Sequence, residues 1–77
     1  MTLSIYERLK RLVVDYGVDE QDLSMDVAFL DDLNLDPIDL GDLFLAIEDE
    51  FDVEIPDEDA RGLLTMRAMV EYIEDQL

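Results

Sequence analysis

The sequence contains neither cysteine nor histidine. Without cysteine the protein has no disulfides, no thiolate metal site and no cysteine nucleophile. Without histidine it lacks the commonest general base and the commonest transition-metal ligand. No glycine-rich phosphate loop is present, and paired carboxylates alone indicate no catalytic pocket. We therefore predict that the protein is not an enzyme and has no metal site.

Basic residues are few and lie toward the two ends of the chain. Five Lys and Arg face 22 Asp and Glu, for a formal net charge of −17. The stretch between residues 12 and 60 has no base and holds 18 of those acids. Such a field repels nucleic acid and anionic lipid and steers the protein toward basic protein surfaces. We expect partners of that kind, although the plainer interpretation is that the acids keep the protein soluble.

Long apolar runs are also missing. No run approaches the roughly 18 residues of a membrane span, and no charged-then-apolar leader comes before the first amphipathic segment. With 77 residues, of which 49% are hydrophobic, the chain is long enough for one small core. We expect a single domain over residues 1–77, monomeric, cytoplasmic and not attached to a membrane.

The first amphipathic segment predicts a helix that ends at Gly17. Ser4 and Glu7 form a capping-box pattern, although Thr2 is an alternative start. Its apolar stripe is Ile5, Leu9, Leu12, Val13 and Tyr16. A long connection over about residues 17–35 follows, without clear periodicity. Apolar anchors along this connection predict that it packs over the bundle. These anchors are Leu23, Val27, Phe29, Leu30 and Leu33.

The later segments predict three more helices. The second runs from about Pro37 to Phe51, and Gly41 in its interior costs about 1 kcal/mol relative to alanine. Its buried stripe is Leu40, Leu43, Phe44, Ile47 and Phe51. Residues 52–56 are extended, and a short helix follows over about residues 57–62. Thr65 then caps the last helix. Its expected buried positions are Met66, Met69, Val70, Ile73 and Leu77. The fold class is therefore an all-α four-helix bundle, with three longer helices, one short helix and a long first loop.

Residues 29–56 read FLDDLNLDPIDLGDLFLAIEDEFDVEIP. This stretch resembles the centre of the acyl carrier protein family. There an apolar-acidic run leads to Asp-Ser-Leu-Asp at the start of the second helix, and an acidic helix then ends in Glu-Glu-Phe before an Ile-Pro step. The matching positions are Asp36, Ile38 and Asp39 in the motif and residues 30–33, 48–51 and 54–58 around it. The flanking helices extend the resemblance over nearly the whole chain.

The resemblance implies a carrier of acyl groups, with one chemical departure. In the family, the motif serine is esterified with 4′-phosphopantetheine, whose thiol holds acyl groups as thioesters. Here that position is Pro37, which has no hydroxyl, so we predict no bound cofactor. With Asp36 as N-cap, proline falls at the first helical position, where it suits the helix. Ser4 and Ser24 lack the motif context and have simpler capping or turn roles.

The resemblance also implies a docking face on the second helix, to which acyl-processing enzymes present Lys and Arg. By position, this face comprises Asp36, Asp39, Asp42, Leu45, Glu48 and Asp49. For any single acid, a solvated helix face is an equally good interpretation. Gly41 stands where the family usually has an aliphatic residue, so part of this face differs from the family pattern.

Several alternatives stay open or fail. Asp32, Asn34 and Asp36 have the first spacings of an EF-hand loop, but Pro37 and Leu43 stand where that loop needs glycine and glutamate. An acidic DNA mimic would explain the charge but not the ordered motif.

Within the family, two hypotheses remain. The protein has lost acyl carriage and keeps docking as a regulatory, scaffold or decoy partner in a fatty-acid or polyketide-type pathway, or it is a variant or inactivated copy of a working carrier.

Overall fold

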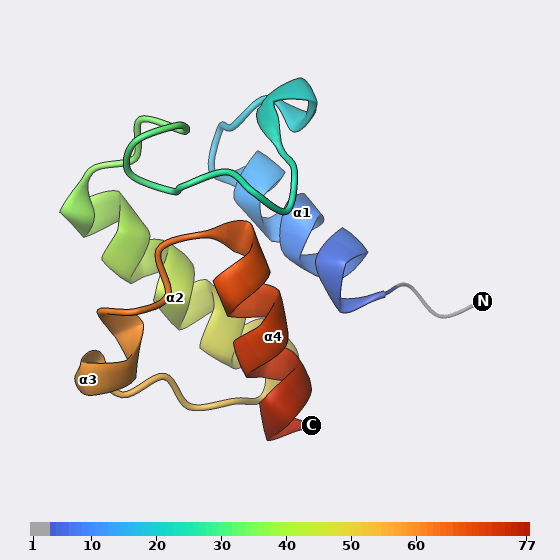
Figure 1. Cartoon of the computed structure of the whole chain (residues 1–77), viewed down its shortest axis with the longest axis vertical. Coiled ribbons are helices and arrows are strands. Elements are labelled where there is room, and N and C mark those ends of the chain that lie inside the picture. Colours follow the sequence, from blue (N-terminus) through green and yellow to red (C-terminus); the bar gives the residue numbers. More distant parts are fainter. Residues whose placement is uncertain (1–3) are drawn as a thin grey trace.

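The structure, a computed structural model, describes residues 4–77, and within that range it is helical (Figure 1). The α-helices are α1 (Ile5–Asp15), α2 (Pro37–Phe51), α3 (Asp57–Ala60) and α4 (Met66–Gln76). A short 3-10 helix, η1, covers Glu20–Asp22. One isolated antiparallel bridge joins Ala28 to Thr65. The all-α four-helix fold predicted from the sequence is confirmed.

Helix α1 begins where the capping pattern predicts. The Ser4 Oγ accepts the Glu7 N–H at 3.1 Å and also donates to Glu7 Oε1 at 3.1 Å. The alternative start at Thr2 lies outside the described residues. After the helix, Gly17 has a φ of +96°, which residues with a side chain rarely adopt. The prediction that Tyr16 belongs to the apolar stripe of this helix is wrong. Tyr16 is exposed, and its hydroxyl donates to the Asp42 carbonyl at 3.0 Å.

The core lies where α1, α2 and α4 face one another. Leu9 and Val13 enter from α1. All five predicted positions of α2 are buried: Leu40, Leu43, Phe44, Ile47 and Phe51. In α4 the predicted methionines, Val70 and Ile73 are buried as well. Leu77 is the exception, 70% exposed, because α4 ends at Gln76 and Leu77 only supplies its C-cap.

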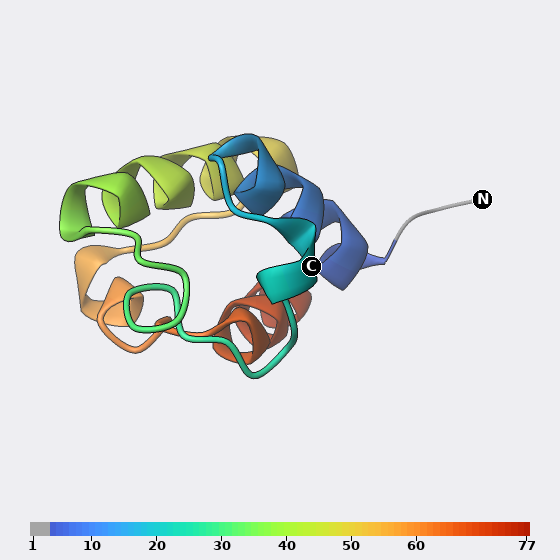
Figure 2. The same ribbon diagram turned by 90° about the horizontal axis from the view of Figure 1, so that it is seen from above.

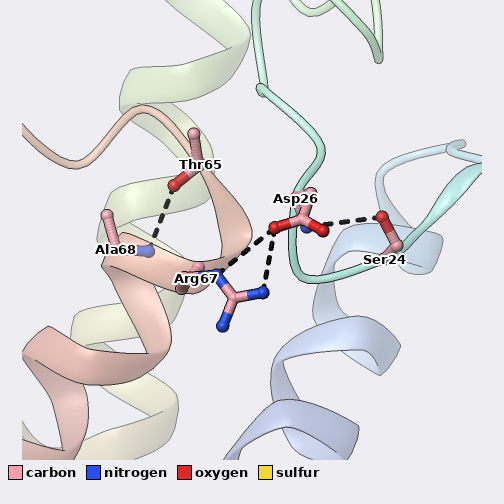
Figure 3. A network of polar contacts seen from close by, with 5 residues as sticks. All are labelled: Ser24, Asp26, Thr65, Arg67 and Ala68. Carbon is pink, nitrogen blue, oxygen red and sulfur yellow. Dashed lines mark hydrogen bonds and ion pairs between the residues drawn. The ribbon is translucent and has the colours of Figure 1, made fainter.

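The long loop is tied to the start of α4. The Met66 N–H donates to the Val27 carbonyl and the Arg67 N–H to the Met25 carbonyl, at 3.1 and 2.8 Å. These first-turn N–H groups have no partner inside the helix, so the loop supplies the acceptors that they need. Figure 3 shows the side chains at this junction, where Arg67 pairs with Asp26 at 2.9 Å.

Phe29 anchors the same loop from inside. It is fully buried, and its N–H donates to the Leu64 carbonyl at 2.9 Å. Seen from above, the loop runs from α1 past the start of α4 to the start of α2 (Figure 2). The prediction that this connection packs over the bundle is therefore confirmed, and the η1 turn is an addition to it.

Helix α3 is shorter than predicted, ending at Ala60 rather than near Gly62. No side chain caps it, and the N–H groups of its last two residues, Asp59 and Ala60, donate to the Pro56 carbonyl. A single turn with so few internal hydrogen bonds has little to extend it. No helix in residues 4–77 has the length and apolar character needed to cross a bilayer.

Candidate functional site

The start of α2 is built by two adjacent residues, Asp36 and Pro37. Asp36 has extended backbone angles, and its Oδ1 accepts the Asp39 N–H at 2.8 Å. Pro37 is the first residue of the helix, where a missing N–H costs nothing and the fixed φ already suits the helix. Both side chains are exposed. The predicted N-cap and helix start are confirmed.

The loop before Asp36 is shaped by its own hydrogen bonds. Asp32 accepts the Ala28 N–H through Oδ2 at 2.7 Å and returns its N–H to the Ala28 carbonyl at 2.9 Å. Asn34 then turns the chain in the left-handed region, with a φ of 57°. Asparagine tolerates that conformation better than most residues. Figure 1 shows the start of α2 toward the same end of the molecule as η1 and the loop.

The outward face of α2 alternates apolar and acidic side chains. Ile38 and Leu45 are 77% and 65% exposed, and they lie seven residues apart on one face. Asp42 and Asp49 lie on the same face, three or four residues from them, and both are exposed. Leu45 belongs to the docking face predicted from the sequence, whereas Ile38 was predicted only as part of the motif. The seven-residue spacing is the signal that would have joined them.

The acids predicted for docking differ in what they do within the fold. Asp39, Asp42 and Asp49 are exposed, and Asp36 is exposed while also capping α2. Glu48 is half-buried, and its Oε2 accepts the Ile55 N–H at 2.7 Å. That bond holds the extended segment after α2, so Glu48 already has a role within the fold. Docking by these residues stays a prediction.

A groove of about 350 Å³ lies beside this face, between α2 and the segment from α3 to α4. Leu40 and Phe44, both almost fully buried, belong to its lining. The remaining lining residues are Pro37, Gly41, Leu45 and Glu48 of α2, and Ile55, Asp57, Ala60, Arg61 and Leu64 beyond it. The lining is mostly apolar, and its charged members are Glu48, Asp57 and Arg61.

The serine and threonine hydroxyls of residues 4–77 are engaged in caps and turns. The Ser4 Oγ caps α1, and the Thr65 Oγ1 caps α4 by accepting the Ala68 N–H at 3.1 Å. The Ser24 Oγ accepts the Asp26 N–H at 3.3 Å (Figure 3). At the start of α2, the pyrrolidine ring of Pro37 offers no atom that could form a phosphodiester. The residues of this helix start therefore do not fit an esterified prosthetic group.

Three of the five bases form ion pairs, and none of these pairs involves the acids on the outward face of α2. Arg8 pairs with Glu50 at 2.9 Å and stacks over the Phe51 ring. Arg67 pairs with Asp26, whose hydrogen bond and charge raise the pKa of the guanidinium above its ordinary value. Neither interaction involves Asp42 or Asp49. Within residues 4–77, no cluster of three or more acids has the arrangement of a metal site.

A small helical bundle with an exposed, N-capped second helix and an acidic outward face has the form of a carrier-protein domain. The family described as "Phosphopantetheine attachment site" matches residues 7–73. This match covers most of the chain, so the chain belongs to that family. Domains of this kind present a group to partner enzymes rather than catalyse reactions themselves.

Proposed function

We propose that this protein is an acyl carrier protein homologue of a fatty-acid or polyketide-type thioester pathway that carries no acyl group. It acts by docking the acidic face of α2 onto basic surfaces of acyl-processing enzymes, as a regulator, scaffold or decoy. The observation that carries the proposal is Pro37 as the first residue of α2, directly after the Asp36 cap. The proposal includes the assignment of Pro37 to the position at which the family attaches its prosthetic group.

The contacts around Pro37 support a loss of carriage without a loss of fold. The cap bond from the Asp39 N–H to Asp36 is 2.8 Å, and the Leu40 N–H donates to the Asp36 carbonyl at 3.0 Å. Both are bonds that a helix start normally has. Of the residues proposed for docking, Asp36, Asp39, Asp42, Leu45 and Asp49 are exposed, so the loss of attachment leaves most of the docking face accessible.

Two other functions are alternatives to this proposal. A variant or inactivated copy of a working carrier would share the fold and the acidic face and differ in its history. An acidic DNA mimic accounts for the net charge of −17 but not for the family match over residues 7–73. We propose a monomeric protein of the cytoplasm, with protein partners and with neither nucleic acid nor membrane as a ligand.

The test is co-expression with a broad-specificity phosphopantetheinyl transferase, followed by intact mass measurement. We compare the native chain, the Pro37→Ser variant and the matched Pro37→Ala control. Only Pro37→Ser should gain the prosthetic group, because it alone has a hydroxyl at this position.

Modification of the native chain would overturn the proposed loss of carriage, and Ser24→Ala and Ser4→Ala variants would then locate the attachment. An unmodified Pro37→Ser variant that still folds by circular dichroism would count against docking to enzymes of this family. In that case the acidic face has diverged as well as the nucleophile.

A further inference from the structure

The segment over residues 56–62, which contains α3, has few contacts with the rest of the molecule. No residue of α3 is buried, and only Ala60 is half-buried against the core. The backbone bonds of the turn stay inside the segment: the Pro56 carbonyl accepts from Asp59 and Ala60, and the Asp59 carbonyl accepts from Gly62. Figure 1 shows α3 at the edge of the molecule, with irregular chain on both sides.

The two ends of this segment, in contrast, are fixed. Ile55 and Leu63 are buried, and the Ile55 N–H donates to Glu48 Oε2 at 2.7 Å. After the segment, the Leu64 carbonyl accepts the Phe29 N–H at 2.9 Å. Motion of residues 56–62 between these anchors therefore does not require α2 or α4 to leave the core.

Hollows lie on both sides of α3. The groove of about 350 Å³ beside α2 is lined on this side by Asp57, Ala60 and Arg61. A second hollow, of about 450 Å³, lies between Asp59 and Gly62 and the side chains of α4. Little close packing therefore holds α3 in place from either side.

One polar side chain of α4 reaches across to α3. The Tyr72 hydroxyl contacts Asp59 Oδ2 at 2.9 Å and the Glu54 carbonyl at 3.0 Å. Among the side chains of residues 4–77, that of Tyr72 is the one from another helix that forms a hydrogen bond with α3. This bond joins the weakly packed segment to a helix that is firmly held in the core.

We propose that residues 56–62 form a strap that closes the groove beside α2, and that the Tyr72 hydroxyl holds the strap closed through Asp59. When this bond breaks, the strap opens between its two anchors and exposes Ala60 and the groove. Short segments with little burial and few hydrogen bonds open locally at low free-energy cost. The proposal concerns motion within the fold, so the outcome of the transferase experiment neither supports nor opposes it.

The chain has no cysteine, so a single introduced thiol can report on the strap. Ala60→Cys places the thiol at a half-buried position of α3 that lines the groove. Ala46→Cys places it at a half-buried position of α2 and is the matched control. Alkylation by iodoacetamide, a small neutral reagent, is followed by intact mass in water and in urea below the unfolding transition, with and without Tyr72→Phe.

The Ala60→Cys thiol should react faster than the Ala46→Cys thiol, at a rate that urea changes little, because local opening exposes little surface. Adding Tyr72→Phe should raise the rate at Ala60→Cys about three- to fivefold, the factor expected for one net hydrogen bond lost from the closed state. Asp59→Ala should raise it similarly. Asp57→Ala, which removes an acid of the same turn that Tyr72 does not contact, should leave it unchanged.

An alkylation rate at Ala60→Cys that does not respond to Tyr72→Phe would overturn the proposal. A rate that rises with urea as steeply as that of Ala46→Cys would also reject it, because exposure would then require unfolding of the whole bundle. Equal increases with Asp57→Ala and Asp59→Ala would show that the charge of the turn, rather than the bond to Tyr72, keeps the strap closed.

Discussion

The outward faces of α2 and α4 use their polar side chains in different ways. On α4, Arg67 pairs with Asp26 of the loop, and the Tyr72 hydroxyl donates to the Glu54 carbonyl and Asp59 Oδ2 at 3.0 and 2.9 Å. On α2, the side chains of Asp42 and Asp49 have no hydrogen bond or ion pair with any other part of residues 4–77.

The difference indicates that contacts of the α4 face stabilise the fold, whereas the outward face of α2 makes few contacts within it. The face of α4 and the first loop are joined by backbone and side-chain bonds, so changes there should reduce stability. The face of α2 also keeps Ile38 and Leu45 exposed, and its residues contribute little to the fold. Changes there should affect association and leave the stability of the protein nearly unchanged.

The strongest test of this division replaces a loop anchor. Phe29→Ala should lower the free energy of unfolding by about 3–5 kcal/mol, because it empties a fully buried site beneath the loop. The matched control, Ile38→Ala, removes an exposed apolar side chain and should stay within about 0.5 kcal/mol of the native protein. Urea unfolding followed by circular dichroism measures both, and similar losses for the two variants would break the comparison.

A smaller effect is expected at the boundary between the two regions. Asp36→Ala removes the acceptor of the Asp39 N–H and should cost about 1 kcal/mol, as for other N-caps. Asp42→Ala removes an acid of the same charge that caps nothing, and its effect on unfolding should be within about 0.5 kcal/mol. Equal losses in the two variants would show that charge, not capping, governs the start of α2.

The smallest effect concerns Tyr72 and is best seen through pH. Partial burial, followed by the hydrogen bond and charge of Asp59, raises the pKa of Tyr72 above the ordinary 10.0. The folded state therefore holds this proton more tightly than the unfolded state, and its contribution is complete below pH 10.0 and lost as pH rises through the raised pKa.

Thermal melts of the native chain and Tyr72→Phe across this range provide the measurement. The native chain should lose stability more steeply above pH 10.0 than Tyr72→Phe. At neutral pH the variant should be less stable by under about 1 kcal/mol, since exposed hydrogen bonds contribute little net. Parallel pH curves for the two proteins would show that Tyr72 does not hold α4 to α3.

Local patterns determined much of the fold. The caps by Ser4, Asp36 and Thr65 and the bounds of α2 were predicted, because a cap involves residues only two or three apart. The buried stripe of α2 follows from helical periodicity alone. The family resemblance was likewise visible in the order of residues 29–56, and the match over residues 7–73 confirms it.

The tertiary structure decided the features that depend on partners far along the chain. The Ala28–Thr65 bridge joins residues that precede and follow α2 in the sequence. Tyr16 lies outside the core, and its hydroxyl donates to the Asp42 carbonyl. The side chain of Glu48 is half-buried, and its Oε2 accepts the N–H of Ile55 from the segment that follows α2. The groove at Gly41 exists only because Arg61 and Leu64 come to face α2, an arrangement set by packing between segments that no local pattern encodes.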